Sequence, residues 1–299
     1  MAGATERNLR AITDTLEKNR TNILLIQPSR IGDVVFTLPF LSNLRKMYPY
    51  ARISWLVDDR CAPLLDGNQY LDEKIIFPFK KLSIAMPFYT LNEIVKLRRI
   101  LVERDFDLSI DLHGLAKSAF IAALSGAREK IASASTYGMK EFSWFVSKEI
   151  QAGDETQHAI ERQFEVLKYL AKNDSKSAQM PVDKFEMEFP LPSEPADDRY
   201  VDDILKEKGI DKSDKIVAIL TGGGWKSRRW LPERFSKACD LIARECGAKI
   251  VFIGGAPGGS SEAGIIEEVI SKMEALPYNL AGKLSLKQLI AFLRKCSLY

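Results

Sequence analysis

The sequence lacks the residues and runs that several classes of protein require. It has only two histidines and four cysteines among 299 residues, and Cys61, Cys239, Cys246 and Cys296 form no CxxC pair. A zinc site with the usual Cys/His spacing is therefore not expected, and scattered thiols are typical of a reduced, cytoplasmic protein. No apolar run approaches the ~20 residues of a transmembrane helix. The charged N-terminus also lacks the apolar core of a signal peptide.

An excess of charge of one sign is also lacking. The 43 Lys and Arg residues against 40 Asp and Glu residues give a formal net charge of +3, which is too small to indicate a nucleic-acid partner. Hydrophobic residues make up 46% and charged residues 28%, as in soluble globular proteins. This composition excludes collagen-like, coiled-coil and wholly disordered chains, and the length suggests two domains.

Short apolar runs alternate with helical patterns in two parts of the chain. In the first part we expect strands at 22–27, 52–57, 74–77, 108–112 and 130–133, and helices from 34 onward and at 90–104, 116–124 and 158–172. In the second part we expect strands at 215–220 and 249–254, and helices at 200–208, 232–246, 260–273 and 285–295. This alternation predicts an α/β fold of βαβ units with mostly parallel sheets.

The alternation divides the chain into four expected parts. They are an N-terminal helical extension (1–21), a Rossmann-like domain (22–172), a linker with four prolines (173–198) and a second Rossmann-like domain (199–299). Residues 184–189 could form a strand inside the linker. Residues 296–299 look like the beginning of another strand, so we expect the second domain to be truncated. In such folds ligands bind at the carboxyl ends of the strands, and the expected site is the cleft between the domains.

The loop after the first strand carries an acidic and a basic side chain. Asp33 stands where a helix begins, with its carboxylate at the top of the expected sheet. It could cap the free N–H groups of the helix, or it could act as a base in a cleft. Gly32 is expected to provide the tight or left-handed backbone of this loop. Arg30 could bind an anion or remain a solvated charge.

Two glycine-rich loops follow strands in the second part of the chain. In the first of them, the candidate phosphate-binding residues are Gly222, Gly223, Gly224, Lys226 and Arg228. Glycines allow close backbone approach, and basic side chains balance phosphate charge; a flexible basic connection is the alternative. In the second loop, Glu262 could accept hydrogen bonds from ribose hydroxyls or simply suit the first turn of a helix. The first of these loops is neither a Walker A nor a GxGxxG motif.

A third strand-to-helix loop, residues 111–118, lies in the first part of the chain. Lys117 and Ser118 occupy the first turn of the expected helix, where they could bind an acidic acceptor. A lysine at that position opposes the helix dipole, which disfavours a purely structural role. His113 and His158 are expected to be structural rather than catalytic.

Together these motifs resemble the ADP-heptose:lipopolysaccharide heptosyltransferases of glycosyltransferase family 9. The matching segments are 22–63, with Arg30-Ile31-Gly32-Asp33-Val34 and Thr37-Leu38-Pro39, and 111–118, 157–162, 228–235 and 279–286. The resemblance implies a GT-B fold of two Rossmann-like domains. It implies transfer of heptose from ADP-heptose to the inner core of lipopolysaccharide, with inversion and without a metal or cofactor. The acceptor would bind the N-terminal domain and the nucleotide sugar the C-terminal one.

The resemblance also implies roles for individual residues. Asp33 matches the catalytic carboxylate, which would act as general base. Arg30, Lys117 and Ser118 would bind the acidic acceptor, and Arg228 would stabilise the leaving diphosphate. Leu231 is an insertion relative to the family pattern. A later Asp-Ser/Thr-Gly-x-x-His motif of the family, which contacts the donor, has no counterpart within these 299 residues.

The expected partners are a nucleotide-sugar donor and a lipid-anchored lipopolysaccharide acceptor. Between Lys74 and Arg104 the sequence has seven basic and two acidic residues, with aromatic residues between them. This segment is either an ordinary basic surface or a peripheral contact with the inner leaflet of the inner membrane, which would place the protein at its cytoplasmic face. Two other functions remain open. One is a non-catalytic sugar-nucleotide-binding fragment; the other is a GT-B sugar-nucleotide epimerase, although the C-terminal half has no histidine for that chemistry.

Overall fold

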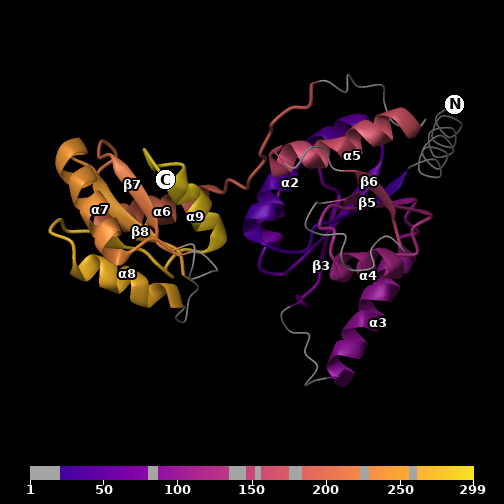
Figure 1. Ribbon diagram of the computed structural model, residues 1–299, viewed down its shortest axis with the longest axis horizontal. Helices are drawn as coiled ribbons and strands as arrows, with labels where there is room; N and C mark the ends of the chain where they lie inside the picture. Colours follow the sequence, from indigo (N-terminus) through magenta and orange to yellow (C-terminus); the bar gives the residue numbers. More distant parts are fainter. Residues whose placement is uncertain are drawn as a thin grey trace, which may run out of the picture. The chain divides into compact units, whose positions relative to one another are not determined.

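The computed structural model describes residues 21–79, 87–134, 146–151, 156–174, 184–222, 229–255 and 261–299. The chain forms two compact units, Met1–Leu191 and Pro192–Tyr299 (Figure 1). The helix expected within residues 1–20 lies outside the described part of the chain. None of the helices in the described part is both long and apolar enough to span a bilayer.

The first unit is built on a six-stranded parallel sheet with the order β3-β2-β1-β4-β5-β6. The strands are β1 (Asn22–Ile26), β2 (Arg52–Val57), β3 (Glu73–Ile76), β4 (Leu108–Asp111), β5 (Glu129–Ala134) and β6 (Lys148–Gln151). The chain moves outward in one direction through β2 and β3, and then returns to the other side of β1 through β4. The carboxyl ends of β1 and β4 are therefore a switch point, where open α/β sheets bind ligands.

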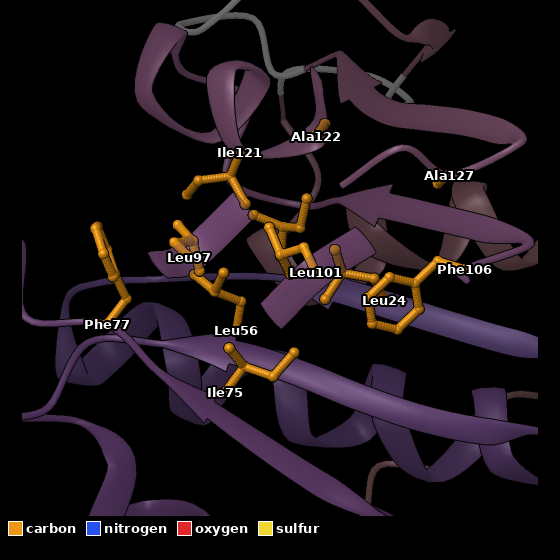
Figure 2. Close-up of a cluster of buried hydrophobic side chains, with 11 residues drawn as sticks. Leu24, Leu56, Ile75, Phe77, Leu97, Leu101, Phe106, Ile121, Ala122 and Ala127 are labelled. Carbon is orange, nitrogen blue, oxygen red and sulfur yellow. The ribbon is translucent and has the colours of Figure 1, made fainter. Parts of the chain in front are cut away.

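Helices cover both faces of this sheet. They are α2 (Ile31–Met47), α3 (Pro87–Glu103), α4 (Ala116–Leu124) and α5 (Ala159–Asn173), with a 3-10 turn η1 (Ala62–Leu65) after β2. On one face, Leu97 and Leu101 of α3 and Ile121 of α4 pack onto Leu24 and Leu56 of the sheet (Figure 2). Successive strand residues point to opposite faces, and α2 and α5, which pack against each other, cover the second face (Figure 1).

The second unit has a three-stranded parallel sheet with the order β7-β8-β9. Its elements are α6 (Pro195–Glu207), β7 (Ile216–Leu220), α7 (Pro232–Cys246), β8 (Lys249–Ile253), α8 (Ser261–Ser271), β9 (Tyr278–Asn279) and α9 (Leu286–Leu293). One hydrophobic cluster lies under α6 and α9, and another lies under α7 and α8. Leu298 pairs in parallel with Val217 on β7, as expected for a strand that begins at 296–299.

The segment predicted as a linker contributes to both units. Residues 184–190 form no strand, and the backbone of Glu186 bonds a side chain instead of a neighbouring strand. The Asn43 side chain donates to the Glu186 carbonyl at 2.9 Å and accepts from the Glu186 N–H at 3.1 Å. Tyr70 donates to the Glu188 carboxylate at 2.8 Å. The segment up to residue 191 is therefore fixed to the first unit, and α6 of the second unit begins at Pro195.

Candidate active site

A pocket of about 150 Å³ lies at the carboxyl edge of the first sheet. It is formed where β1, β4 and β5 end, beside the first turns of α2 and α5. The lining residues are Gln27, Asp33, Phe36, Leu112, His113, Ser133, Ala159, Arg162 and Gln163. The pocket therefore coincides with the switch point between β1 and β4, and Asp33 is one of its walls.

Asp33 lies in the first turn of α2 but does not cap it. The N-cap residue is Arg30, and no side chain caps the helix. No residue in the described ranges forms a hydrogen bond with the Asp33 carboxylate, although its carbonyl accepts from Thr37 Oγ1 at 2.9 Å. Burial raises the pKa of Asp33, and the nearby positive charge of Arg30 lowers it in part. A half-buried carboxylate with a raised pKa is well suited to accept a proton.

The unusual backbone of this loop is at Arg30 rather than Gly32. Arg30 has φ 67° and ψ 121°, a region that favours glycine, whereas Gly32 lies within α2. The expectation of a left-handed Gly32 is therefore wrong. A Cβ added to Gly32 would meet no atom within 4 Å, so the space above it is open. Backbone strain of about 1–3 kcal/mol at Arg30 is the kind of cost that active sites retain.

Cationic side chains follow three different strands at this edge of the sheet. Arg30 follows β1 and its charge acts on Asp33, Arg60 follows β2, and Lys117 lies in the first turn of α4 after β4. The charge of Arg60 acts on Lys117, and the charges of Lys117 and Arg30 both act on His113. Arg60 Nε donates to the buried Asp58 carboxylate at 2.7 Å. Lys117 lies over the Phe79 ring, with Nζ 3.7 Å from its centroid, and burial lowers the pKa of Lys117. This set of cations suits an anionic ligand. The sequence interpretation missed Arg60, although a basic residue just beyond an apolar strand was a usable signal.

Ser118 is fully buried beneath this cluster. Its hydroxyl donates to the Leu115 carbonyl at 2.8 Å and accepts from the Leu115 N–H at 3.0 Å. These two bonds close the first turn of α4. The structure thus engages the Ser118 hydroxyl within its own turn, next to Lys117.

The turn between β4 and α4 contains two titratable groups of unusual pKa. Asp111 is fully buried, and its Oδ1 accepts from the backbone N–H groups of His113 at 2.9 Å and Gly114 at 3.0 Å. Burial raises the pKa of Asp111 to about 6. Burial and the charges of Lys117 and Arg30 lower the pKa of His113 to about 4. At neutral pH the His113 ring in the pocket is therefore uncharged.

The residues assigned to the donor lie mostly outside the described part of the second unit. This applies to Gly223, Gly224, Lys226 and Arg228 and to the side chain of Glu262, whereas Gly222 is described and is the second residue after β7. The loop after β8 begins with Gly254 at φ 102° and Gly255 at φ 73°, values that favour glycine. Among the described residues, no group of three or more His, Cys, Asp or Glu side chains could hold a metal ion.

Known proteins resemble this chain over most of its length. The model of glycosyltransferase family 9 (heptosyltransferase) matches residues 94–299. Lipopolysaccharide heptosyltransferase 1 of Pseudomonas aeruginosa is 25% identical over 290 residues, covering 92% of this chain and 72% of that protein. The crystal structure of a family 9 glycosyltransferase from Veillonella parvula has a TM-score of 0.75 at 23% identity, covering 93% of this chain and 75% of that one.

The structure of ADP-heptose lps heptosyltransferase II from Escherichia coli is also similar. Its TM-score is 0.67 at 18% identity, with 93% of this chain and 78% of that chain covered. These structural likenesses confirm the α/β fold with mostly parallel sheets that the sequence predicted.

Proposed function

The chain belongs to glycosyltransferase family 9, the heptosyltransferase family, and on this premise we propose that it transfers heptose from ADP-heptose to the inner core of lipopolysaccharide. The observation that carries the proposal is the Asp33 carboxylate. It lines a pocket at the switch point of the first sheet, and burial raises its pKa. The Arg30 side chain lies close to Asp33, where it would bind an acid group of the acceptor next to the base.

In the proposed reaction Asp33 is the general base. It takes the proton from an acceptor hydroxyl as the hydroxyl oxygen forms a bond with the anomeric carbon of heptose. The bond between that carbon and the diphosphate oxygen breaks on the opposite face, so the configuration inverts and ADP leaves. Its raised pKa makes Asp33 a better proton acceptor than an ordinary aspartate.

We assign stabilisation of the leaving ADP to the loops of the second unit. Lys226 and Arg228 would offset the charge that develops on the diphosphate, with backbone N–H groups of 222–224 beside them. Glu262 would bind the ribose. This assignment makes the reaction independent of a metal ion, because protein cations supply the charge.

The cations of the first unit are assigned to the acceptor. Arg30, Arg60 and Lys117 would bind the acid groups of the inner-core sugar and bring its hydroxyl to Asp33. Ser118 would contribute by holding the turn that carries Lys117, through its bonds to Leu115.

A transfer assay tests the function. The chain is incubated with ADP-heptose and lipopolysaccharide from a strain that makes no heptose. We expect the acceptor to gain the mass of one heptose for each ADP released. NMR of the product should show the inverted anomeric configuration, and the rate should be unchanged in EDTA. UDP-glucose is the control donor and should give no product. Release of ADP without a glycosylated product, or retained configuration, would contradict the proposal.

We also propose that α3 contacts the anionic inner leaflet where the lipid-anchored acceptor resides. Its residues Leu97 and Leu101 are buried, whereas a second apolar stripe at helical spacing is exposed. The stripe consists of Phe88, Leu91, Val95 and Val102, which are 88%, 60%, 57% and 46% exposed. Figure 1 shows α3 extending away from the sheet of its unit.

The apolar stripe, more than the net charge, supports this contact. Lys74 pairs with Asp66, and Arg104 pairs with Glu73. On α3 itself, Lys96 pairs with Glu93 and Arg99 pairs with Glu103. Asp66 and Glu73, which lie outside the segment, therefore offset two of its five excess positive charges, while the exposed Phe and Leu side chains can enter the headgroup region.

Sedimentation with phosphatidylglycerol-containing vesicles tests the membrane contact. The double variant Phe88→Ser/Leu91→Ser should bind at least fivefold less protein, while its transfer rate on deacylated acceptor stays unchanged. Tyr50→Ser is the matched control, because Tyr50 is 84% exposed and lies outside α3. Equal binding by the double variant and the control would exclude this surface.

A further inference from the structure

Two residues that line the pocket beside Asp33 have buried amide oxygens that no described residue satisfies. They are Oε1 of Gln27, which follows β1, and Oε1 of Gln163 on α5. The two residues are only 2% and 9% exposed. A buried acceptor without a partner costs about 1–3 kcal/mol, so such groups are uncommon and point to a ligand.

The orientation of the Gln163 amide follows from its partner. The Thr37 hydroxyl has a single hydrogen, which it donates to the Asp33 carbonyl at 2.9 Å. The Gln163 group 3.1 Å from Thr37 Oγ1 must therefore be the NH₂ group. Since the NH₂ group is fixed on Thr37, the amide oxygen of Gln163 is left for the pocket.

Gln27 is oriented in the same way. Its Nε2 lies 3.4 Å from the Ser29 carbonyl, which can only accept a hydrogen bond. The same nitrogen lies 3.3 Å from His113 Nδ1. Nδ1 is then the acceptor, and the neutral His113 ring carries its proton on Nε2. Gln27 thus also keeps its amide oxygen for a ligand.

From this arrangement we infer that Gln27 and Gln163 accept hydrogen bonds from hydroxyl groups of the acceptor sugar and so determine how it is placed against Asp33. Two carbonyl dipoles would repel an anion but accept O–H donors. The acid groups of the same sugar would bind Arg30 and Lys117 rather than the two glutamines. Both oxygens are buried in the structure, so a sugar hydroxyl reaches them when the side chains that cover them move aside, while the NH₂ groups keep their bonds to Thr37 and Ser29.

This inference rests on the proposed function only for the identity of the acceptor. It predicts a site for a neutral, hydroxyl-bearing face of a sugar acid, formed by residues from two distant parts of the chain. Transfer of heptose is not needed to observe it, because the acceptor binds whether or not a donor reacts.

Calorimetry with deacylated, heptose-free core oligosaccharide tests the inference. Gln27→Met and Gln163→Met remove the amide oxygens while keeping the length of the side chain. Each should weaken oligosaccharide binding at least tenfold and leave the affinity for ADP-heptose unchanged. Gln69→Met, at an exposed glutamine that does not line the pocket, is the control and should bind as the original chain does.

A methylated ligand separates this role from a structural one. Methylation of the free hydroxyls of the terminal acid sugar should cost the original chain at least tenfold in affinity and cost the double variant Gln27→Met/Gln163→Met nothing further. If the original chain binds the oligosaccharide but transfers no heptose, the proposed function fails and the glutamine site stands. If the original chain does not bind the oligosaccharide, or the variants bind like the control, the glutamine site is excluded.

Discussion

At the scale of single residues, Asp33 and Arg30 form the chemically distinctive pair of the first loop. An aspartate at the start of a helix is usually explained as a cap, but α2 has no side-chain cap, and Asp33 lines a pocket instead. Arg30 accounts for the placement: its positive φ turns the chain from β1 into α2 so that Asp33 reaches the pocket edge. The carboxylate is left to exchange protons with a ligand.

Replacement of Arg30 should change the pH dependence of transfer. Arg30 lowers the pKa of Asp33, so Arg30→Met should raise that pKa further. A base works only when deprotonated, so the acid limb of the kcat/KM profile should move to higher pH. Arg128→Met, at an exposed arginine paired with Asp105, is the control and should leave the limb in place. A limb that stays or moves to lower pH in Arg30→Met would exclude Asp33 as the titrating base.

The strained backbone of Arg30 leads to a second prediction. Glycine adopts φ 67° without the steric penalty that arginine has there. Arg30→Gly should therefore raise the free energy of unfolding, measured with urea, by about 1 kcal/mol. It should also raise the KM for the acceptor, measured by steady-state kinetics. A less stable Arg30→Gly protein would mean that the loop is not strained.

At the scale of elements, the turn between β4 and α4 has two opposed contributions to stability. The folded-state pKa of Asp111 is raised to about 6, so its contribution is present at low pH and is lost as pH rises towards 6. The folded-state pKa of His113 is lowered to about 4, so its contribution is present above pH 6.5 and is lost as pH falls towards 4. Each change is on the order of 3 kcal/mol, and the two largely cancel.

Single substitutions should expose the two contributions. Asp111→Asn keeps an acceptor for the N–H groups of His113 and Gly114, and should raise the free energy of unfolding at pH 7 by about 3 kcal/mol. The stability of this variant should rise between pH 4.5 and 6.5. His113→Gln should show the reverse slope. Urea unfolding over this range measures both, and equal slopes in the two variants would contradict the assignment.

The sequence predicted the elements whose signal is local. Near-continuous apolar runs such as Ile23–Ile26 gave the buried strands correctly, because a sheet covered on both faces needs them. The short strands β6 and β9 were missed, because the neighbouring strand that each pairs with defines it more than its own few residues do. The alternating pattern at 184–189 suggested a strand, but the Asn43 side chain forms the hydrogen bonds of the Glu186 backbone that a neighbouring strand would otherwise form.

The site was predictable to a similar extent. Arg30 lies in a strand-to-helix connection, and Asp33 and Lys117 lie in the first turns of the helices that follow β1 and β4, so the sequence placed all three at one sheet edge. Gln163 could not be found in this way, because the Thr37 side chain to which it bonds is 126 residues away in the sequence. Nothing in the local pattern around a glutamine on an amphipathic helix distinguishes a ligand-binding residue from an ordinary one.

At the scale of the whole molecule, the two units correspond to two proposed tasks. The first unit contains the pocket with Asp33, the nearby cations and the exposed stripe of α3. The second unit contains the glycine-rich loops after β7 and β8, which we assign to ADP-heptose. Membership of glycosyltransferase family 9 rests on a match that includes the second half of the first unit and all of the second.

The rate of heptose transfer by Asp33→Asn tests the central claim most directly. The variant keeps the shape of the side chain but cannot take the proton of the attacking hydroxyl. It should transfer heptose roughly 10²–10⁴-fold more slowly than the original chain while binding ADP-heptose as before and unfolding at no lower urea concentration. Asp105→Asn, at an exposed carboxylate of the same unit, is the control and should transfer normally. A near-normal transfer rate in Asp33→Asn would contradict the assignment of Asp33 as the catalytic base.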